Sequence, residues 1–425
     1  MVSRPAWRRL ITAGSIYAAA ATGFLGTVIA ARSLGPHAFG LLSIVLAAQG
    51  FFQLLLDFTV GDAMIKYGFR YVEAERFGRL RRLVGVAFRV QATGAVLGCV
   101  GTLALVPFAD SLFGTEGLER PLLISALVPI AALPIGLANA LVILRGRYEF
   151  HGIVTLITMT GRLVAMAIGS QIGVTETVVL LLVAQVATSS VIGAIGFAAL
   201  RRFPRAEPEP LGEDVPGLRR FVLSSTVGTT LESLRGIFPA LLLGVVSNPT
   251  QVSYFKIAQA PQFGFSVLSA PVRIILLTEQ TREIERGQHD RVAKTLRRYM
   301  LAAAALMLVV VPPALWLMPW LVETVFGDDY SGATNAARLI LLAAAIQAVY
   351  AWTKPFPVSI GRPNLRIVGQ AAEIVVLVPA LLVLGSIWSA TGAGAAVVLG
   401  VAAFAATWTV LVFRLRREWH SRRPA

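Results

Sequence analysis

Three ionisable side chains fall near the middle of long apolar runs, where a charge has little water to solvate it. Arg162 is central in one run, and Glu232 and Arg235 are central in another, three residues apart and so on one face of a helix. Gln185, central in a third run, adds an uncharged polar group. Two cations and one anion leave an excess of positive charge. Because a guanidinium binds a phosphate group through two parallel hydrogen bonds, these residues favour recognition of a phosphate-bearing anion.

The same charges have a second interpretation. An interhelical triad of Arg162, Glu232 and Arg235 would neutralise most of the charge and fix how two helices pack. The sequence leaves both interpretations open.

Other charged residues lie nearer the ends of apolar runs, where long side chains reach the interface. Lys256 lies near the external end of its run, and Glu373 lies two turns into its run. Asp57 and Asp62 lie near the expected cytoplasmic boundary, and Asp62 has the i, i+4 spacing of an ion pair with Lys66. We expect interfacial or paired charges here. Binding of an ion is the other hypothesis for Asp57, Asp62 and Glu373.

The composition of the chain indicates that these residues lie on membrane-spanning helices. Of 425 residues, 56% are hydrophobic and only 14% are charged, whereas soluble proteins carry about 25% charged residues. Mean hydropathy is +0.71. A span of the bilayer needs about 20 apolar residues in a helix. Twelve runs qualify, covering residues 10–31, 38–60, 83–108, 122–144, 153–172, 177–200, 221–246, 252–277, 300–320, 336–356, 367–387 and 392–413.

The distribution of basic residues predicts the orientation. About 29 of the 38 Lys and Arg residues fall in the termini and in alternate loops, and about three fall on the other side. This asymmetry predicts that both termini are cytoplasmic. It also explains the net charge of +15 without any nucleic-acid binding. The basic C-terminal tail is suited to contact with anionic membrane lipids.

The halves of the chain are separated by a polar segment. Residues 201–220 are rich in Pro and Glu, a composition typical of a flexible linker. We therefore expect an N-terminal lobe at 1–200, a cytoplasmic linker at 201–220, and a C-terminal lobe with the basic tail at 221–425. Short matches recur in the same order in both halves, such as Phe113-Gly114 and Phe326-Gly327. With six spans in each half, the pattern predicts a parallel internal repeat.

Several classes of function find no support in the sequence. The single cysteine, Cys99, excludes an internal disulfide framework, and four scattered histidines show no metal-ligand spacing, so we expect no metal and no cofactor. The loops are too short for a folded catalytic domain, and neither a nucleotide-binding loop nor a nucleophile elbow occurs. An enzyme is therefore not expected, and a membrane-embedded glycosyltransferase or ligase is the weakest alternative.

One segment resembles a known family. The stretch 31–42, Ala-Arg-Ser-Leu-Gly-Pro-His-Ala-Phe-Gly-Leu-Leu, is similar to a signature of bacterial polysaccharide-exporting flippases of the O-antigen type. These proteins belong to the multidrug/oligosaccharidyl-lipid/polysaccharide exporter superfamily. The matching positions are Arg32, Leu34, Gly35, Pro36, Phe39 and Gly40. Residues 57–60, Asp-Phe-Thr-Val, resemble a second signature of the family, with Thr59 in place of its usual glycine. Leu-Gly-Pro also suits any tight hairpin between two helices, and Arg32 is a candidate for substrate contact.

The resemblance implies an all-α membrane protein with two six-helix lobes around a central cavity, in the bacterial inner membrane. It implies a transporter that flips an oligosaccharide linked to an isoprenoid pyrophosphate, as in lipopolysaccharide or exopolysaccharide synthesis. Glycan polymerases and glycosyltransferases are the implied protein partners. The cavity residues would be Arg162, Arg235, Glu232, Gln185, Lys256 and Arg32. A drug or cation antiporter of the same superfamily is the alternative. That class is distinguished by a deep acidic residue that binds a cation, whereas an anionic lipid carrier calls for deep cations.

The topology is directly testable. Reporter domains fused after Pro36, Glu116 and Asp328 should all report the external side of the membrane, because the positive-inside rule places these segments there. Paired alkaline phosphatase and green fluorescent protein fusions measure this. A cytoplasmic signal at any one of the three positions would contradict the predicted topology.

Overall fold

The computed structural model describes residues 4–56, 60–147, 149–268, 280, 289–354, 356–360, 362 and 364–421. These residues form helices and short connections, with no β-strand among them. The prediction of an all-α protein is therefore confirmed. The chain divides into two compact units, Met1–Ile237 and Phe238–Ala425.

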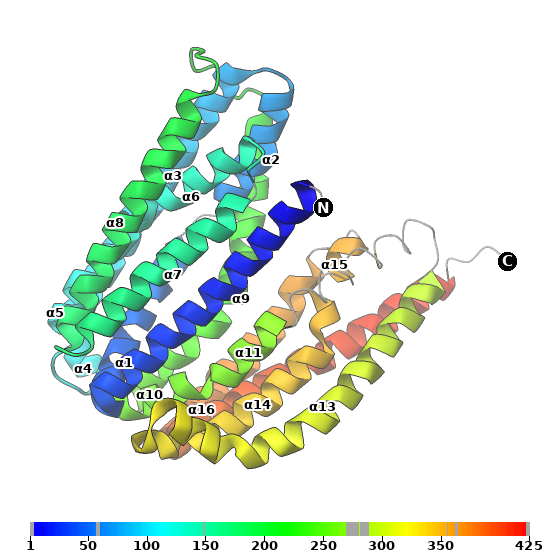
Figure 1. Ribbon diagram of the computed structural model, residues 1–425. Coiled ribbons are helices and arrows are strands. Elements are labelled where there is room, and N and C mark those ends of the chain that lie inside the picture. Colours follow the sequence, from blue (N-terminus) through cyan, green and yellow to red (C-terminus); the bar gives the residue numbers. More distant parts are fainter. Residues whose placement is uncertain are drawn as a thin grey trace. The chain divides into compact units, whose positions relative to one another are not determined.

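The first unit contains α1 to α8 and most of α9 (Figure 1). Its longer helices are α1 (Arg4–Leu56), α2 (Val60–Glu73), α3 (Phe77–Leu105), α6 (Val128–Leu144), α7 (Glu149–Gly169), α8 (Val174–Arg201) and α9 (Asp214–Val246). Shorter elements, η1 (Val106–Phe108), α4 (Ala109–Phe113) and α5 (Glu119–Ser125), connect α3 to α6. Within the unit α7 packs against both α1 and α8, and α6 packs against α2, α3 and α8.

The second unit contains the end of α9 and the helices that follow it (Figure 1). These are α10 (Pro249–Ala258), α11 (Ala260–Leu268), α13 (His289–Phe326), η2 (Asp328–Ala333), α14 (Thr334–Val349), η3 (Ala351–Thr353), α15 (Phe356–Ser359) and α16 (Leu365–Ser421). Here α14 packs against α11, α13 and α16. The end of the eighth predicted span, residues 269–277, lies outside the described residues.

Backbone chemistry sets the breaks between helices at matching points of the two halves. Gly35 has a φ of 74° and divides α1, and Pro36 then opens the next helical segment. In the second half Asn248 accepts a hydrogen bond from the backbone N–H of Gln251, and Pro249 opens α10. The repeated Phe-Gly pairs also end helices, and their glycines, Gly114 and Gly327, have φ values of 59° and 104°.

The helices have the length and surface of membrane spans. Eight helical stretches of described residues are long and apolar enough to cross a bilayer, and α9 qualifies as a bent pair of segments. The longest stretches, Ile11–Glu73 and Leu365–Leu415, are each divided by a non-helical residue, Gly35 and Ser389. Large apolar side chains face outward, with Leu308 77% and Trp316 79% exposed. Such a surface is stable in contact with lipid, not with water.

Residues of the linker between the halves contact the α2–α3 hairpin. The composition of the linker favoured a flexible segment, but Phe203 and Leu211 are buried in an apolar cluster with residues of α2, α3 and α6. At the start of α9, Asp214 accepts hydrogen bonds of 2.8 Å from both Arg70 and Tyr71. Burial of Phe203 and Leu211 and the hydrogen bonds of Asp214 therefore hold the segment against the α2–α3 hairpin, although most of its residues are polar.

Replacing Asp214 should loosen this segment. We expect Asp214→Ala to raise the rate of proteolytic cleavage within residues 202–213 about two- to fivefold, because a partly exposed ion pair contributes about 0.2–1 kcal/mol. Limited trypsin digestion of the purified protein measures the rate. The exposed neighbour Glu213 supplies the control, Glu213→Ala, which should digest like wild type. Equal rates for both variants would show that Asp214 does not hold the linker.

Candidate functional site

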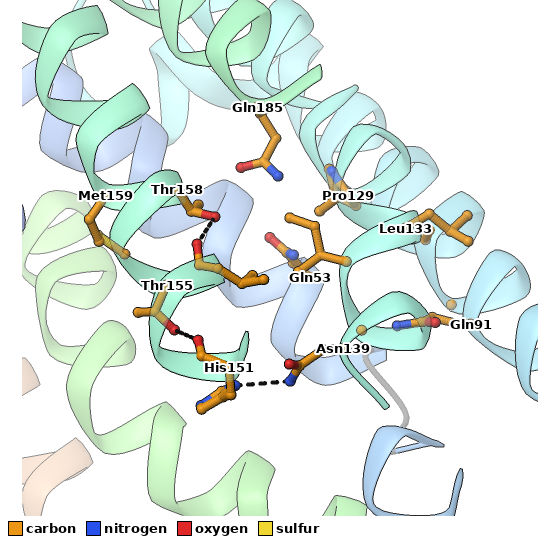
Figure 2. A pocket seen from close by; sticks show the side chains of 16 residues that line it. Gln53, Gln91, Pro129, Leu133, Asn139, His151, Thr155, Thr158, Met159 and Gln185 are labelled. Atoms are coloured by element: carbon orange, nitrogen blue, oxygen red, sulfur yellow. Dashed lines mark hydrogen bonds between the residues drawn. The ribbon is translucent and has the colours of Figure 1, made fainter. Parts of the chain in front are cut away.

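A pocket of about 400 Å³ opens inside the first unit (Figure 2). Side chains from α1, α3, α6, α7 and α8 line it. Part of its wall is apolar, including Pro129, Leu133 and Met159. The rest is formed by amides, hydroxyls and one imidazole. A concave site with a few convergent polar groups is the usual form of a small-molecule binding site.

One face of α7 supplies a polar stripe. His151, Thr155 and Thr158 line the pocket, and Arg162 follows them at the next turn of the same helix. With 3.6 residues per turn, positions i, i+4, i+7 and i+11 share a face. The threonine hydroxyls donate to the carbonyl oxygens of His151 and Val154. Their oxygen atoms therefore remain available as acceptors.

Three glutamine amides come from three other helices. Gln53 of α1, Gln91 of α3 and Gln185 of α8 all line the pocket (Figure 2). The space for Gln91 depends on Gly136 of α6, because a Cβ atom at that position would lie 2.5 Å from the Gln91 Nε2. A larger residue at position 136 would therefore displace the Gln91 amide from its place in the pocket.

Asn139 of α6 and His151 of α7 join two walls of the pocket. The Asn139 Nδ2 lies 2.9 Å from the His151 Nδ1 (Figure 2). When the amide donates, the imidazole accepts at Nδ1 and carries its proton on Nε2. The buried Oδ1 of Asn139 then accepts no hydrogen bond from any described residue.

The predicted midplane charges all fall in the first unit. Arg162 is half-buried on α7 and makes no hydrogen bond or ion pair with a described residue. Arg235 is half-buried on α9. Glu232 lies on α9 as well, and its side chain lies outside the described part of the protein. Of the predicted cavity residues, Gln185 lines the pocket directly.

A comparison of the sequence with known families identifies the chain. The profile of a family described as polysaccharide biosynthesis protein matches residues 29–335. The chain belongs to this polysaccharide biosynthesis family. The match includes the 31–42 segment and all of α7 and α8. No curated protein is similar enough in sequence to count as a match.

Solved structures share the fold of this polysaccharide biosynthesis protein at low sequence identity. A multidrug resistance MATE family transporter of the MOP superfamily, in an inward-facing conformation, aligns with a TM-score of 0.77 and 14% identity over 95% of this chain and 96% of its own. The lipid II flippase MurJ, in an inward closed conformation, aligns with a TM-score of 0.71 and 9% identity over 95% and 87%. A MOP superfamily transporter from Pyrococcus furiosus, described as having a binding pocket of reverse polarity, aligns with a TM-score of 0.62 and 14% identity over 98% and 99%.

These findings confirm the resemblance and the architecture that the sequence predicted. The family match confirms a protein of polysaccharide biosynthesis, and the chain has the fold of transporters of the MOP superfamily and of a lipid II flippase. The predicted fold of twelve helices in two six-helix lobes is that of the MATE and MurJ transporters. The protein is therefore a multi-pass membrane protein.

The other predicted residues of this family member are scattered. Arg32 and Lys256 are exposed, on α1 and α10, and Asp62 is exposed on α2. Asp57 lies outside the described residues. Glu373 of α16, in the second unit, is only 2% exposed. Among them, none of the described residues (Arg32, Asp62, Lys256 and Glu373) lines the pocket of the first unit.

Most residues of the pocket were not predicted from the sequence. His151 precedes the predicted span 153–172, whereas the structure places it in the first turn of α7. A signal for this face was present, because His151, Thr155, Thr158 and Arg162 have helical spacing. Gln53, Gln91 and Asn139 had no comparable signal, because they come from three separate helices.

Single cysteines can test whether the pocket is accessible. Cys99 is the only cysteine in the sequence and is buried, so Cys99→Ser gives a cysteine-free background. In that background we expect Thr158→Cys to react with a small methanethiosulfonate reagent at least about tenfold faster than Thr102→Cys, because thiol reactivity requires access. Thr102 is fully buried in α3. Equal labelling rates would contradict an open pocket at Thr158.

Proposed function

We propose that this protein flips a lipid-linked oligosaccharide, a precursor of a surface polysaccharide, across the bacterial cytoplasmic membrane. The substrate would be carried on an isoprenoid pyrophosphate. Transport would proceed by alternating access, without ATP, and both termini would be cytoplasmic. Glycosyltransferases would supply the substrate and a glycan polymerase would consume it. The family match supports a role in polysaccharide synthesis, and the fold supports a transporter or flippase.

Arg162 is the observation on which the proposal chiefly rests. It lies in the middle of α7, is half-buried, and has no hydrogen-bond or ion-pair partner among the described residues. A charge at such a depth is costly and is usually retained for function. In a protein of polysaccharide synthesis, the pyrophosphate of a lipid carrier is the natural counter-charge, because guanidinium binds phosphate bidentately.

Arg235 and Glu232 complete the proposed anion site. Arg235 would supply a second guanidinium, and Glu232, three residues earlier on α9, would orient it. The carboxylate would also lower the positive electrostatic potential at the anion site, and so the affinity for the pyrophosphate. Binding that is too tight in one state would stall transport, because the substrate must also leave.

The competing hypothesis is a drug or cation antiporter, supported by the fold shared with MATE transporters. Such a protein needs a deep carboxylate that can bind a cation. The pocket of the first unit has none among its lining residues, whereas the second unit buries Glu373. Replacing each charge separately therefore distinguishes the two hypotheses.

Arg162→Ala should abolish glycan export in cells that depend on this protein. A hydrogen-bonded charge contributes about 1.5–3 kcal/mol, so substrate affinity should fall roughly 10- to 100-fold. Arg162→Lys should retain part of the activity, because it keeps the charge and loses the bidentate geometry. Surface glycan can be measured by lectin binding, and protein abundance by immunoblot.

A matched control is Arg120→Ala, because Arg120 is exposed at the start of α5 in the same unit. This variant should export like wild type. Undiminished export by Arg162→Ala would contradict the proposal. Loss of abundance in both Arg162→Ala and Arg235→Ala would instead support the packing triad. Efflux of a drug or cation that is lost in Glu373→Gln and kept in Arg162→Ala would favour the antiporter.

A further inference from the structure

The pocket of the first unit differs in chemistry from the anion site proposed at Arg162. Among the described residues that line it there is neither a carboxylate nor a Lys or Arg. Its polar groups are amides, hydroxyls and the imidazole of His151. An anion would find no full counter-charge there, and a cation would find no carboxylate. The lining therefore favours a neutral polar ligand.

Several of these groups have unused hydrogen-bonding capacity. The Oε1 of Gln53 accepts from Gln49 at 2.5 Å, which leaves the Gln53 amide N–H groups free to donate. The Nε2 of Gln185 donates to Ser189 at 2.9 Å, which leaves its carbonyl oxygen free to accept. Gln91 makes no hydrogen bond with a described residue. Donors and acceptors thus converge from three helices.

The Asn139–His151 pair adds one group of each kind. With the Asn139 amide donating to Nδ1 of His151, the imidazole Nε2–H is a free donor. The Asn139 Oδ1 is a buried acceptor that no described residue satisfies. An unsatisfied buried acceptor is costly, so a ligand hydroxyl that donates to it would be favourable.

A ligand that matches this lining must both donate and accept at several closely spaced positions. Each hydroxyl group of a sugar ring does both. The C–H faces of the ring match the apolar wall at Pro129, Leu133 and Met159. A volume of about 400 Å³ suits a ligand of this size, at the lower end of the range for small-molecule pockets.

We propose that the pocket formed by α1, α3, α6, α7 and α8 binds a neutral monosaccharide unit of the substrate. The inference rests on the proposed function, since it assumes a glycan linked to a lipid pyrophosphate. Arg162 lies one helical turn, about 6 Å along the axis, beyond Thr158 on α7. A sugar joined directly to the pyrophosphate would occupy the pocket while Arg162 holds the phosphate. The lobe thereby recognises the glycan as well as its carrier.

The test measures binding of defined lipids to the purified full chain in nanodiscs. The probes are a polyprenyl pyrophosphate without sugar and the same lipid bearing glucose, galactose, N-acetylglucosamine or glucuronic acid. Wild type should bind at least one neutral glycolipid about tenfold more tightly than the bare lipid. It should bind the glucuronic acid lipid more weakly than the glucose lipid, because the pocket offers no cation to the carboxylate.

Two pocket variants separate the sugar from the pyrophosphate. Gln91→Met and Asn139→Leu should each reduce binding of the preferred glycolipid about five- to thirtyfold and leave the bare lipid unaffected. Gln171→Met is the control, because Gln171 follows α7, hydrogen-bonds to Ser33 and does not line the pocket. Thermal unfolding measured by size-exclusion chromatography identifies any variant that fails to fold. If one of the two variants fails to fold, the glycolipid affinity of the other variant is the result that tests the pocket.

The possible outcomes are distinct. Equal affinity of wild type for sugar-bearing and bare lipids would overturn the sugar pocket and leave the proposed function intact. The same holds if folded Gln91→Met or Asn139→Leu keeps the wild-type preference. Absence of binding to every lipid would overturn the proposed function and the pocket inference with it.

Discussion

The bilayer is the constraint on which the rest of the structure depends. Inside it every backbone N–H and C=O must find a partner within the protein, which leaves helices as the solution for a chain of this composition. The same solvent makes outward-facing side chains apolar, as on α13 and α16, and makes any charge at depth expensive. Polar chemistry is therefore confined to the few helix faces that turn away from lipid. In the first unit such a face is the stripe on α7 from His151 to Arg162.

Much of the fold could be predicted because it follows from local chemistry. The break at Gly35-Pro36 is an example, because glycine tolerates a positive φ and the following proline opens a new helix. The repeated Phe-Gly pairs end helices for the same reason. The break inside α16 is different, because Ser389 adopts a φ of 50°. There the turn is supported by contacts from the α9–α10 connection and from α10, since Ser247 donates to Ser389 and Gln251 accepts from the Ala390 N–H. A sequence read locally does not contain such contacts.

The candidate site was predicted less completely than the fold, because it depends on contacts between segments that are distant in the sequence. Helical periodicity shows which face of α7 is polar, but not which helices meet that face. The lining depends on contacts between helices: Gly136 of α6 leaves room for the Gln91 amide of α3, and Asn139 of α6 reaches His151 of α7. Composition likewise did not reveal the contacts of Phe203, Leu211 and Asp214 that connect the linker between the halves to α2, α3 and α6. A deep charge such as Arg162 is conspicuous in a sequence. A site made of neutral amides becomes visible only when the helices are assembled.

Together these features describe a lobe in which the Arg162 guanidinium and a neutral polar pocket lie along one face of α7. That combination suits a substrate with a charged carrier and an uncharged glycan. We propose that the protein moves such a lipid between leaflets. The most direct test reconstitutes the purified protein into liposomes with a fluorescent polyprenyl pyrophosphate bearing glucose and follows its exposure to a membrane-impermeant quencher. Wild type should expose the inner-leaflet label to the quencher, and Arg162→Ala should leave it protected, as in protein-free liposomes. Continued protection with wild type, together with export of a cationic dye such as ethidium from the same vesicles, would contradict the account.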